Sequence, residues 1–409
     1  MDTGKNPLSE LTAAEQAFVE EHLSDDVSRL ALSLAHTADL RSQLVLRQIE
    51  GLQTLQRKIP SLAAVKGLML PPRLSMEQCS GEAAALYKRR LVERILPHAA
   101  SMADLTGGFG VDFSFMAPLF KKAFYVERQA ELVALARHNM PLLGIGNAEF
   151  LEAEAEAALS EMPPLDMIFL DPARRDGSGR KVVMLADCSP DVEQLMPALL
   201  AKARCVLIKL SPMLDLHAAV ASLAAVSEVH IVADRGEVKE LLLLATSDAP
   251  QQPRIFCADG GMSFSFLPDE EVAAEPLQAT AVGKYLYEPH AALLKAGAFK
   301  LPTARFSVQK LHPNSHLYTS DTLHEDFPGR IFRVEKTYDF SRSGIRDFIA
   351  DFGSGKTPGR AQANVAVRNF PLTAVELRNR LHLSDGGSHY VFGTTLSPAR
   401  RIVILASKV

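Results

Sequence analysis

Long apolar runs are missing from this sequence. Such runs as residues 205–208 and 241–245 fall far short of the ~20 apolar residues with which a helix spans a bilayer. The N-terminal segment MDTGKNPLSELTAAEQ has no apolar core behind a basic start, which a secretory signal would need. We therefore expect a soluble, cytoplasmic protein with no membrane partner.

Cysteine is scarce and histidine is scattered. The four cysteines are Cys79, Cys188, Cys205 and Cys257. They form no C-x-x-C pair, which excludes a disulfide framework or a zinc site of the usual spacing. His312 and His316 are four residues apart, but Pro313 between them argues against the helix that would bring both to one face. We expect no metal site.

Charge is distributed unevenly along the 409 residues. Of the 44 basic and 48 acidic residues, 18 and 10 lie in residues 276–409, a balance of +8, which leaves −12 for residues 1–275. A basic C-terminal part favours a polyanionic partner, above all nucleic acid; a basic face that docks on an acidic neighbour is the alternative. The length itself indicates more than one domain.

The first 250 residues change character near residue 99. Residues 1–98 are typical of helices, with a capping-box pattern at Thr12 and Glu15. After them, short apolar runs alternate with helical stretches. Strands are expected at residues 101–105, 123–127, 148–152, 167–171, 204–209, 228–233 and 241–245. Strands separated by helices predict a parallel sheet covered on both faces, a doubly wound α/β core over residues 99–250.

Beyond Pro250 the pattern breaks again. Residues 270–279 have the composition of an exposed linker, and the remainder mixes short strands and helices, with strands at residues 330–338 and 401–406. Residues 353–357 (GSGKT) are similar to part of a phosphate-binding P-loop. Ala350 stands where the full pattern needs glycine, so we interpret this segment as an ordinary loop.

A glycine-rich loop follows the first expected strand of the core. Residues 104–110 read DLTGGFG, in which the G-G-x-G order differs from the G-x-G-x-x-G of dinucleotide-binding folds. Glycines let the backbone approach a ligand closely. Asp104 at the strand end suits a ligand with a cationic amino group better than a pyrophosphate, which prefers bare helix N–H groups.

Acidic residues also follow the next strands. Glu127 ends the second strand, 23 residues after Asp104, where a carboxylate can bind both hydroxyls of a ribose. After the third strand, Glu154 is placed to accept from an adenine amine, with the backbone N–H of Ala155 free to meet the ring. Together these positions predict a nucleoside-containing ligand.

In order and position, the segments DLTGGFG, VE, EAE and DPAR resemble the motifs of class I S-adenosylmethionine-dependent methyltransferases. The resemblance covers about residues 99–250 and implies S-adenosylmethionine as cofactor. The residues that it and the strand positions assign to the cofactor are Asp104, Thr106, Gly107, Gly108, Gly110, Glu127, Glu154 and Ala155.

Segments outside the core resemble one particular group of these methyltransferases. SMEQCSGE (75–82), KLSPMLD (209–215), YLYEPHAALLKAG (285–297) and residues 363–377 are similar to a bacterial group of these enzymes. In that group a ferredoxin-like segment and a THUMP-like domain, a module associated with RNA modification, follow the core. The resemblance implies a helical domain (1–98), the core (99–250), a ferredoxin-like segment (276–329), a THUMP-like domain (330–409) and a base of tRNA or rRNA as substrate.

The D-P-A-R segment at the end of the fourth strand is the expected catalytic corner. Asp171 is the candidate to accept a proton or hydrogen bond from the attacking nitrogen, with Pro172 beside it. Enzymes that methylate base amines carry D/N-P-P followed by an aromatic residue; here Arg174 takes the aromatic position. Arg174 either contacts the substrate or is an ordinary surface residue.

Further substrate contacts are expected from Lys209 and Ser211 after the fifth strand, although Lys209 can equally cap the sheet edge. Arg378 and Arg380 are two residues apart beside Leu377 and Leu381, so at least one of the two arginines faces solvent, and we assign both to RNA. Two rival functions remain: a small-molecule methyltransferase, and a non-catalytic RNA-binding protein. The acidic residues at the strand ends argue against the second rival, and the C-terminal charge argues against the first.

Overall fold

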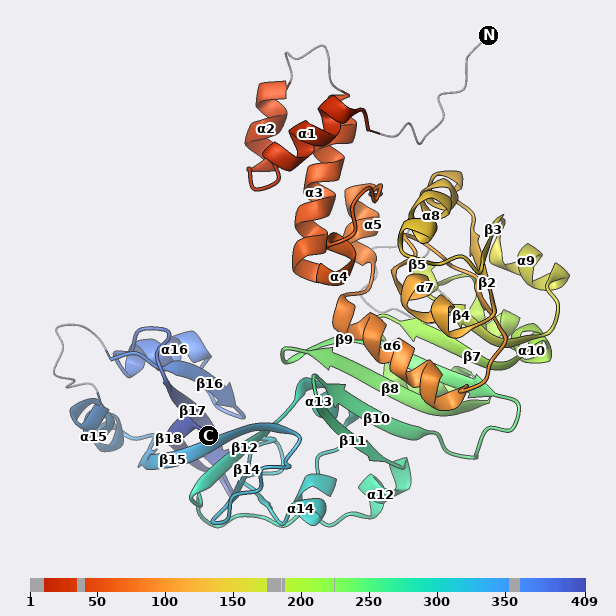
Figure 1. The fold of residues 1–409 in the computed structure, drawn as a ribbon. Helices are drawn as coiled ribbons and strands as arrows, with labels where there is room; N and C mark the ends of the chain where they lie inside the picture. Colours follow the sequence, from red (N-terminus) through yellow and green to blue (C-terminus); the bar gives the residue numbers. More distant parts are fainter. Residues whose placement is uncertain (1–10, 35–40, 175–184, 186–187, 224, 353–360) are drawn as a thin grey trace, which may run out of the picture. The chain divides into compact units, whose positions relative to one another are not determined.

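A computed structural model describes the chain except residues 1–10, 35–40, 175–184, 186–187, 224 and 353–360 (Figure 1). The chain forms two compact units. The first comprises residues 1–234 and 239–253, and the second comprises residues 235–238 and 254–409. No helix in the described part of the chain is long and apolar enough to cross a membrane.

The described part of residues 1–98 contains helices and their connecting turns, and no strand. The helices are α1 (Ala13–Glu21), α2 (Val27–Leu34), α3 (Ser42–Lys58), α4 (Pro60–Ala63), α5 (Arg73–Gln78) and α6 (Glu82–Ile95). The capping box predicted at Thr12 and Glu15 is present, with each side chain bonded to the backbone N–H of the other residue. Leu55 and Leu70 pack in one buried cluster with Phe109 of the glycine loop and with Val111 directly after it, so the helices support that loop.

The core of the first unit is a sheet in the order β8-β9-β7-β4-β1-β2-β3 (Figure 1). Its strands are β1 (Ser101–Asp104), β2 (Lys122–Glu127), β3 (Ala148–Glu152), β4 (Leu165–Leu170), β7 (Ala203–Leu210), β8 (Val226–Asp234) and β9 (Glu237–Thr246). The helices between them are α7 (Val111–Met116), α8 (Ala130–Leu142), α9 (Ala155–Glu161), α10 (Val192–Lys202) and α11 (Leu216–Ser222). The predicted α/β fold is confirmed.

The sheet is mixed, which corrects the expectation of an all-parallel one. β7, β4, β1, β2 and β3 are parallel, whereas β9 runs antiparallel to β7. Only Arg235 and Gly236 separate β8 from β9, both at positive φ (53° and 77°). A turn of two such residues joins antiparallel strands, because a parallel crossover needs a dozen or more residues.

The strand order reverses between β1 and β4. The first crossovers place β2 and β3 on one side of β1, and the later ones place β4 and β7 on the other. In open α/β sheets ligands bind at such a switch point, beyond the carboxyl ends of the strands. The glycine loop after β1 and the residues after β2, β4 and β7 therefore surround one position.

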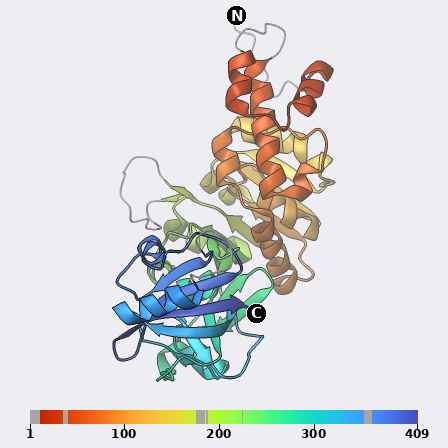
Figure 2. The ribbon, with the colours of Figure 1, turned by 90° about the vertical axis from the view of Figure 1, so that its left-hand side faces the viewer.

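The second unit contains a seven-stranded sheet in the order β13-β14-β12-β15-β18-β17-β16, whose strands lie side by side in the cyan to blue part of Figure 2. Its strands are β12 (Tyr285–Pro289), β13 (Gln309–Lys310), β14 (Tyr318–Ser320), β15 (Gly329–Asp339), β16 (Asn364–Arg368), β17 (His389–Leu396) and β18 (Arg400–Lys408). Its helices include α13 (Ala291–Ala296), α14 (Leu301–Arg305), α15 (Arg342–Phe352) and α16 (Ala374–Arg380). Phe348 of α15 and Leu377 of α16 pack in one buried cluster with Val403 of β18.

The expected linker at residues 270–279 is partly helical, which corrects that expectation. After the hairpin of β10 (Arg254–Asp259) and β11 (Met262–Phe266), α12 spans Pro268–Ala273. Proline at the first helical position and three acidic residues in the first turn favour a helix start. Glu271 also accepts hydrogen bonds from the backbone N–H groups of Phe299 and Leu301, at 3.0 Å each, and so caps α14.

Candidate active site

The glycine loop between β1 and α7 fits tightly against its own sheet. A Cβ on Gly107 would lie 2.3 Å from the Tyr125 ring, and a Cβ on Gly110 would lie 2.4 Å from the end of the Met140 side chain. Gly108 and Gly110 have φ angles of 56° and 84°, which side chains disfavour. The loop therefore turns directly over the end of β2, and glycine is required at these positions.

Asp104 ends β1 and is buried, with 2% of the residue exposed. Its Oδ1 accepts the backbone N–H of Thr106 at 2.9 Å. Burial raises the pKa of this carboxyl group to about 8, more than that hydrogen bond lowers it, and the neighbouring carboxylates Asp112, Asp171 and Glu127 add to the rise. Among the described residues, no basic side chain pairs with Asp104, so the site holds a buried acid without a cation.

Glu127 at the end of β2 organises the two loops beside it. Its Oε2 accepts the N–H of Gly108 at 3.0 Å and its Oε1 accepts the N–H of Gln129 at 2.9 Å. Each carboxylate oxygen can accept a second hydrogen bond. The carboxylate is thus fixed in place and still has room to accept from two ligand hydroxyls.

The structure places the expected adenine contacts at the start of α9. Glu154 precedes this helix and is exposed; its carboxylate lies 3.9 Å from the Arg128 guanidinium. Ala155 is buried at the first turn. Glu154 is therefore free to move toward a ligand, unlike Glu127, whose carboxylate is held by two N–H groups.

Asp171 follows β4 directly. Its backbone N–H donates to the Thr106 hydroxyl at 2.6 Å, and its Oδ2 lies 2.5 Å from Lys209 Nζ. Pro172 is half-buried beside it. Residues Ala173–Arg174 form the short strand β5, paired with β6 (Cys188–Ser189), a pairing that the sequence did not predict. The side chain of Arg174 and the whole of Arg175 lie outside what the structure describes.

Lys209 lies near the end of β7 and contacts two carboxylates. Besides Asp171, its Nζ lies 3.4 Å from Asp112 Oδ2. Burial works to lower the pKa of this lysine, but Asp171, Asp112 and Glu240 together raise it well above its usual value. Lys209 is therefore a charged side chain near the carboxyl end of β7, next to the end of β4.

Further buried charged residues connect Lys209 to the interior of the first unit. Asp112 Oδ1 lies 3.1 Å from Lys88 Nζ on α6, and Lys88, fully buried, also pairs with Glu240 of β9. The Ser80 hydroxyl donates to Asp112 Oδ2 at 2.8 Å. We call Lys88, Asp112, Lys209 and Glu240 the buried charge network. Each of the two lysines contacts two carboxylates: Lys88 contacts Asp112 and Glu240, and Lys209 contacts Asp112 and Asp171.

The remaining candidates are divided between the two units. Ser211 follows β7, and its hydroxyl accepts the Met213 N–H at 3.3 Å. Arg378 and Arg380 lie on α16 in the second unit. Arg378 is half-buried and pairs with Asp385 at 3.0 Å, whereas Arg380 is exposed and its guanidinium lies 5.2 Å from the Phe340 ring. The GSGKT segment at residues 353–357 lies outside the described residues.

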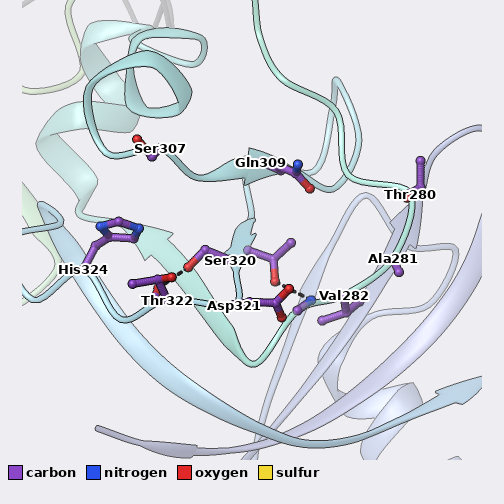
Figure 3. Close-up of a pocket in the computed structure, with 11 residues that line it drawn as sticks. Thr280, Ala281, Val282, Ser307, Gln309, Ser320, Asp321, Thr322 and His324 are labelled. Carbon is purple, nitrogen blue, oxygen red and sulfur yellow. Dashed lines mark hydrogen bonds between the residues drawn. The ribbon is translucent and has the colours of Figure 1, made fainter.

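The second unit also contains a hollow of 410 Å³ (Figure 3). Its lining residues are mainly hydroxyl-bearing or otherwise uncharged, with Asp321 and His324 as the titratable ones. Gly283 is required there because a Cβ would lie 2.7 Å from the Ser320 backbone. No lysine or arginine belongs to its described lining, so this hollow is not suited to phosphate groups.

Neither the His312–His316 spacing nor any other described residues bring together three or more side chains that could hold a metal ion. His316 stacks instead on Phe299, with ring centroids 3.9 Å apart. His312 accepts the Asn314 N–H at 3.1 Å. Both histidines thus have local structural roles.

The strand order, the glycine loop after β1 and the acidic residues at the carboxyl ends of β1, β2 and β4 define a class I S-adenosylmethionine-dependent methyltransferase. Models of a ferredoxin-like domain and of a THUMP-like domain match residues 285–328 and 329–408. A Porphyromonas gingivalis W83 protein, whose crystal structure is described as that of a methyltransferase, is 35% identical with a TM-score of 0.85, covering 97% of this chain and 98% of its own.

Proteins of two Mycobacterium tuberculosis strains, H37Rv and CDC 1551, are each 25% identical over 312 residues, 76% of this chain and 80% of theirs. Both are named uncharacterized S-adenosylmethionine-dependent methyltransferases. The chain belongs to the family of S-adenosylmethionine-dependent methyltransferases with C-terminal ferredoxin-like and THUMP-like domains. The expected class of enzyme and its cofactor are confirmed.

The residues present fit this cofactor. S-adenosylmethionine supplies an electrophilic methyl group on a sulfonium and carries an α-amino group that is cationic near neutral pH. Asp104 is a buried acid for which no described residue supplies a cation, and such an acid is stabilised by a ligand's ammonium group. The spare acceptor capacity of Glu127 suits a ribose diol.

The sequence did not point to Ser80, Lys88, Asp112 or Glu240 as site residues. Lys88 stands in a Tyr-Lys-Arg-Arg stretch that reads as a solvated helix face. Glu240 directly precedes the buried LLLLA run, and a charge inside a buried strand was the one available signal.

Proposed function

We propose that this methyltransferase acts on RNA, which its second unit captures. The observation that carries the proposal is a group of exposed arginines around Phe340, namely Arg342, Arg380 and Arg401. Arg380 lies over the Phe340 ring at 5.2 Å, and the carbonyl of Arg401 accepts the Phe340 N–H at 2.9 Å. Arg342 begins α15 two residues later.

The positive charge of these three arginines is not neutralised by a described carboxylate. Within the described residues, none of the three forms an ion pair, whereas Arg400 pairs with Asp339 at 2.6 Å and Arg378 pairs with Asp385. Unpaired guanidinium groups bind phosphates bidentately, and the balance of +8 after residue 276 adds a favourable field. The match to a THUMP-like domain agrees with this use. We assign phosphate contacts first to Arg380 and only second to its neighbour Arg378.

In the proposed complex the first unit holds the cofactor. Asp104 pairs with its amino group, Glu127 binds the ribose hydroxyls, and Glu154 with the Ala155 N–H binds the adenine. Thr106, Gly107, Gly108 and Gly110 shape the loop that approaches it. Asp171, with Pro172 fixing the chain after it, receives the hydrogen of the attacking atom, and alignment of that atom supplies much of the rate. Lys209 and Ser211, at and after the end of β7, and Arg174, which follows β4 along the chain, are the proposed substrate contacts of this unit.

Transfer of label tests the proposal. The full-length enzyme is incubated with tritium-labelled S-adenosylmethionine and total RNA from a strain that lacks the gene. We expect label in this RNA, and little in RNA of the parent strain, because its sites are already methylated. Label that appears only in a small-molecule fraction of the same extract would overturn the RNA proposal in favour of a small-molecule methyltransferase.

A further inference from the structure

Two side chains of opposite charge meet at the catalytic corner. Asp171 Oδ2 and Lys209 Nζ are 2.5 Å apart, and the exposed fractions of the two side chains are 38% and 11%. Asp171 Oδ1 has no hydrogen-bond partner among the described residues. The Lys209 ammonium has three protons, and Asp171 and Asp112 account for two. The corner therefore offers one acceptor and one cationic donor side by side.

The buried charge network holds the Lys209 ammonium group in place. Asp112 contacts both Lys209 and Lys88, and Lys88 is paired with Glu240. If Lys209 were neutral, the buried carboxylate of Asp112 would lose one of its two cationic partners, which is costly. Lys209 therefore remains an ammonium group, and Asp171 is the proton acceptor of the pair.

A base amine has no need of such a pair. An exocyclic amine attacks as a neutral group, and a cation beside it draws electron density away from the attacking nitrogen. A hydroxyl oxygen, in contrast, must lose its proton and carries negative charge as the new bond forms. A fixed cation next to that oxygen stabilises the developing charge, and a carboxylate receives the proton.

The segment after Asp171 also favours a hydroxyl over a base amine as the attacking group. Enzymes that modify a flipped-out base hold it by stacking between aromatic or apolar side chains. The residues that follow Asp171 are Pro172 and Ala173, and no aromatic side chain stands in the D-P-A-R segment. A ribose hydroxyl, which is both donor and acceptor, can be reached from the backbone of a single strand without such stacking.

We propose that the atom methylated by this site is a ribose 2′-oxygen of RNA, rather than the base atom that the sequence suggested. The inference rests on the proposed action on RNA. The hydroxyl oxygen forms the new C–O bond as the methyl carbon leaves the sulfonium sulfur, which keeps the bonding electron pair. The hydroxyl proton passes to Asp171 Oδ1 and then to water. Lys209 is the catalytic cation, and Lys88, Asp112 and Glu240 are positioning residues.

Alkaline hydrolysis of the labelled RNA tests the inference with the wild-type enzyme. A 2′-O-methyl group removes the hydroxyl that alkali uses to cleave the neighbouring phosphodiester. We expect the label in alkali-stable dinucleotides. Label in mononucleotides would place the methyl group on a base and overturn the inference while the RNA proposal stands. RNA without any label would overturn both.

Variants of Lys209 test the role of the cation. We expect Lys209→Met to lower kcat by about a hundredfold or more, as loss of one charge-stabilising donor does, with the Kd for S-adenosylmethionine nearly unchanged in calorimetry. Lys209→Arg should recover part of the rate, since the charge returns. The control is Lys122→Met, at a half-exposed lysine paired with Glu149.

A structural role would give a different result. If Lys209→Met and Lys209→Arg lost rate equally, or if Lys209→Met lost cofactor binding along with rate, the assignment of Lys209 as catalytic cation would be wrong. Melting temperatures of all variants separate these results from loss of folding. The alkali test on the wild-type enzyme decides the site of methylation even if Lys209→Met fails to fold.

Discussion

The hydroxyl of Thr106 accepts a hydrogen bond from the backbone N–H of Asp171 at 2.6 Å. The N–H of Thr106 in turn donates to Asp104. One threonine therefore connects the glycine loop after β1 to the catalytic corner after β4. The bond to Asp171 uses the main chain, so the position of this corner does not depend on the Asp171 side chain.

We therefore expect Asp171→Ala to leave the cofactor Kd nearly unchanged and to slow transfer by two or more orders of magnitude, ~2.7 kcal/mol of barrier. Calorimetry and single-turnover transfer to RNA measure the two effects. A collapse of affinity together with rate would instead make Asp171 a cofactor ligand.

Glu127→Ala should weaken S-adenosylmethionine binding by about 1.5–3 kcal/mol, the usual value of hydrogen bonds to a charged group. Glu127→Gln should lose less, because its amide oxygen can still accept the Gly108 N–H. Calorimetry compares the two with Glu149→Ala, a change at a half-exposed carboxylate on β3. An unchanged Kd in Glu127→Ala would mean that the ribose binds elsewhere.

Cofactor affinity should depend on pH through Asp104. Its folded-state pKa of about 8 means that the free enzyme carries a protonated carboxyl at pH 6, and the cationic ligand favours the ionised form. Binding therefore releases a proton, and affinity should rise by about tenfold from pH 6 to 7.5. Above pH ~8 it should fall again as the ligand amine deprotonates. Asp104→Asn should bind weakly with a flat profile between pH 6 and 7.5; a flat wild-type profile there would contradict the pairing.

Lys88→Met should destabilise the protein by about 3–5 kcal/mol, because it leaves Glu240 without its buried cation. Adding Glu240→Gln should restore part of this loss. Urea unfolding measures both, and Arg89→Ala on the exposed face of α6 should change stability by no more than about 0.5 kcal/mol. Equal stability of Lys88→Met and wild type would show that the network contributes nothing.

Replacing Arg342, Arg380 and Arg401 together by alanine should flatten the salt dependence of RNA binding. Each single-strand phosphate contact contributes ~0.7 to the slope of log K against log salt, so the slope should change by up to about 2. Arg400→Ala is the control, since Arg400 is already paired with Asp339. Filter binding across a salt series measures the slopes; an unchanged slope in the triple variant would place the RNA elsewhere.

The local pattern of apolar and charged residues was sufficient to predict the core strands. Predicted and observed bounds differ by a residue or two for most of them, since apolar runs flanked by charged residues mark a buried strand. The direction of β9 was missed, because it depends on the two-residue turn at Arg235 and Gly236. Pairing across the sequence was also missed: nothing near Lys88 reveals that its partner is Glu240, 152 residues later.

That separation has a consequence for synthesis on the ribosome. The helices that support the glycine loop emerge first, and chains grow by about 5–20 residues per second. Lys88 can be buried at low cost only once Glu240 has left the exit tunnel. We therefore expect the nascent first unit to stay open around α6 until β9 is made, and a chain interrupted before that strand to leave α6 undocked and accessible to quality-control proteases.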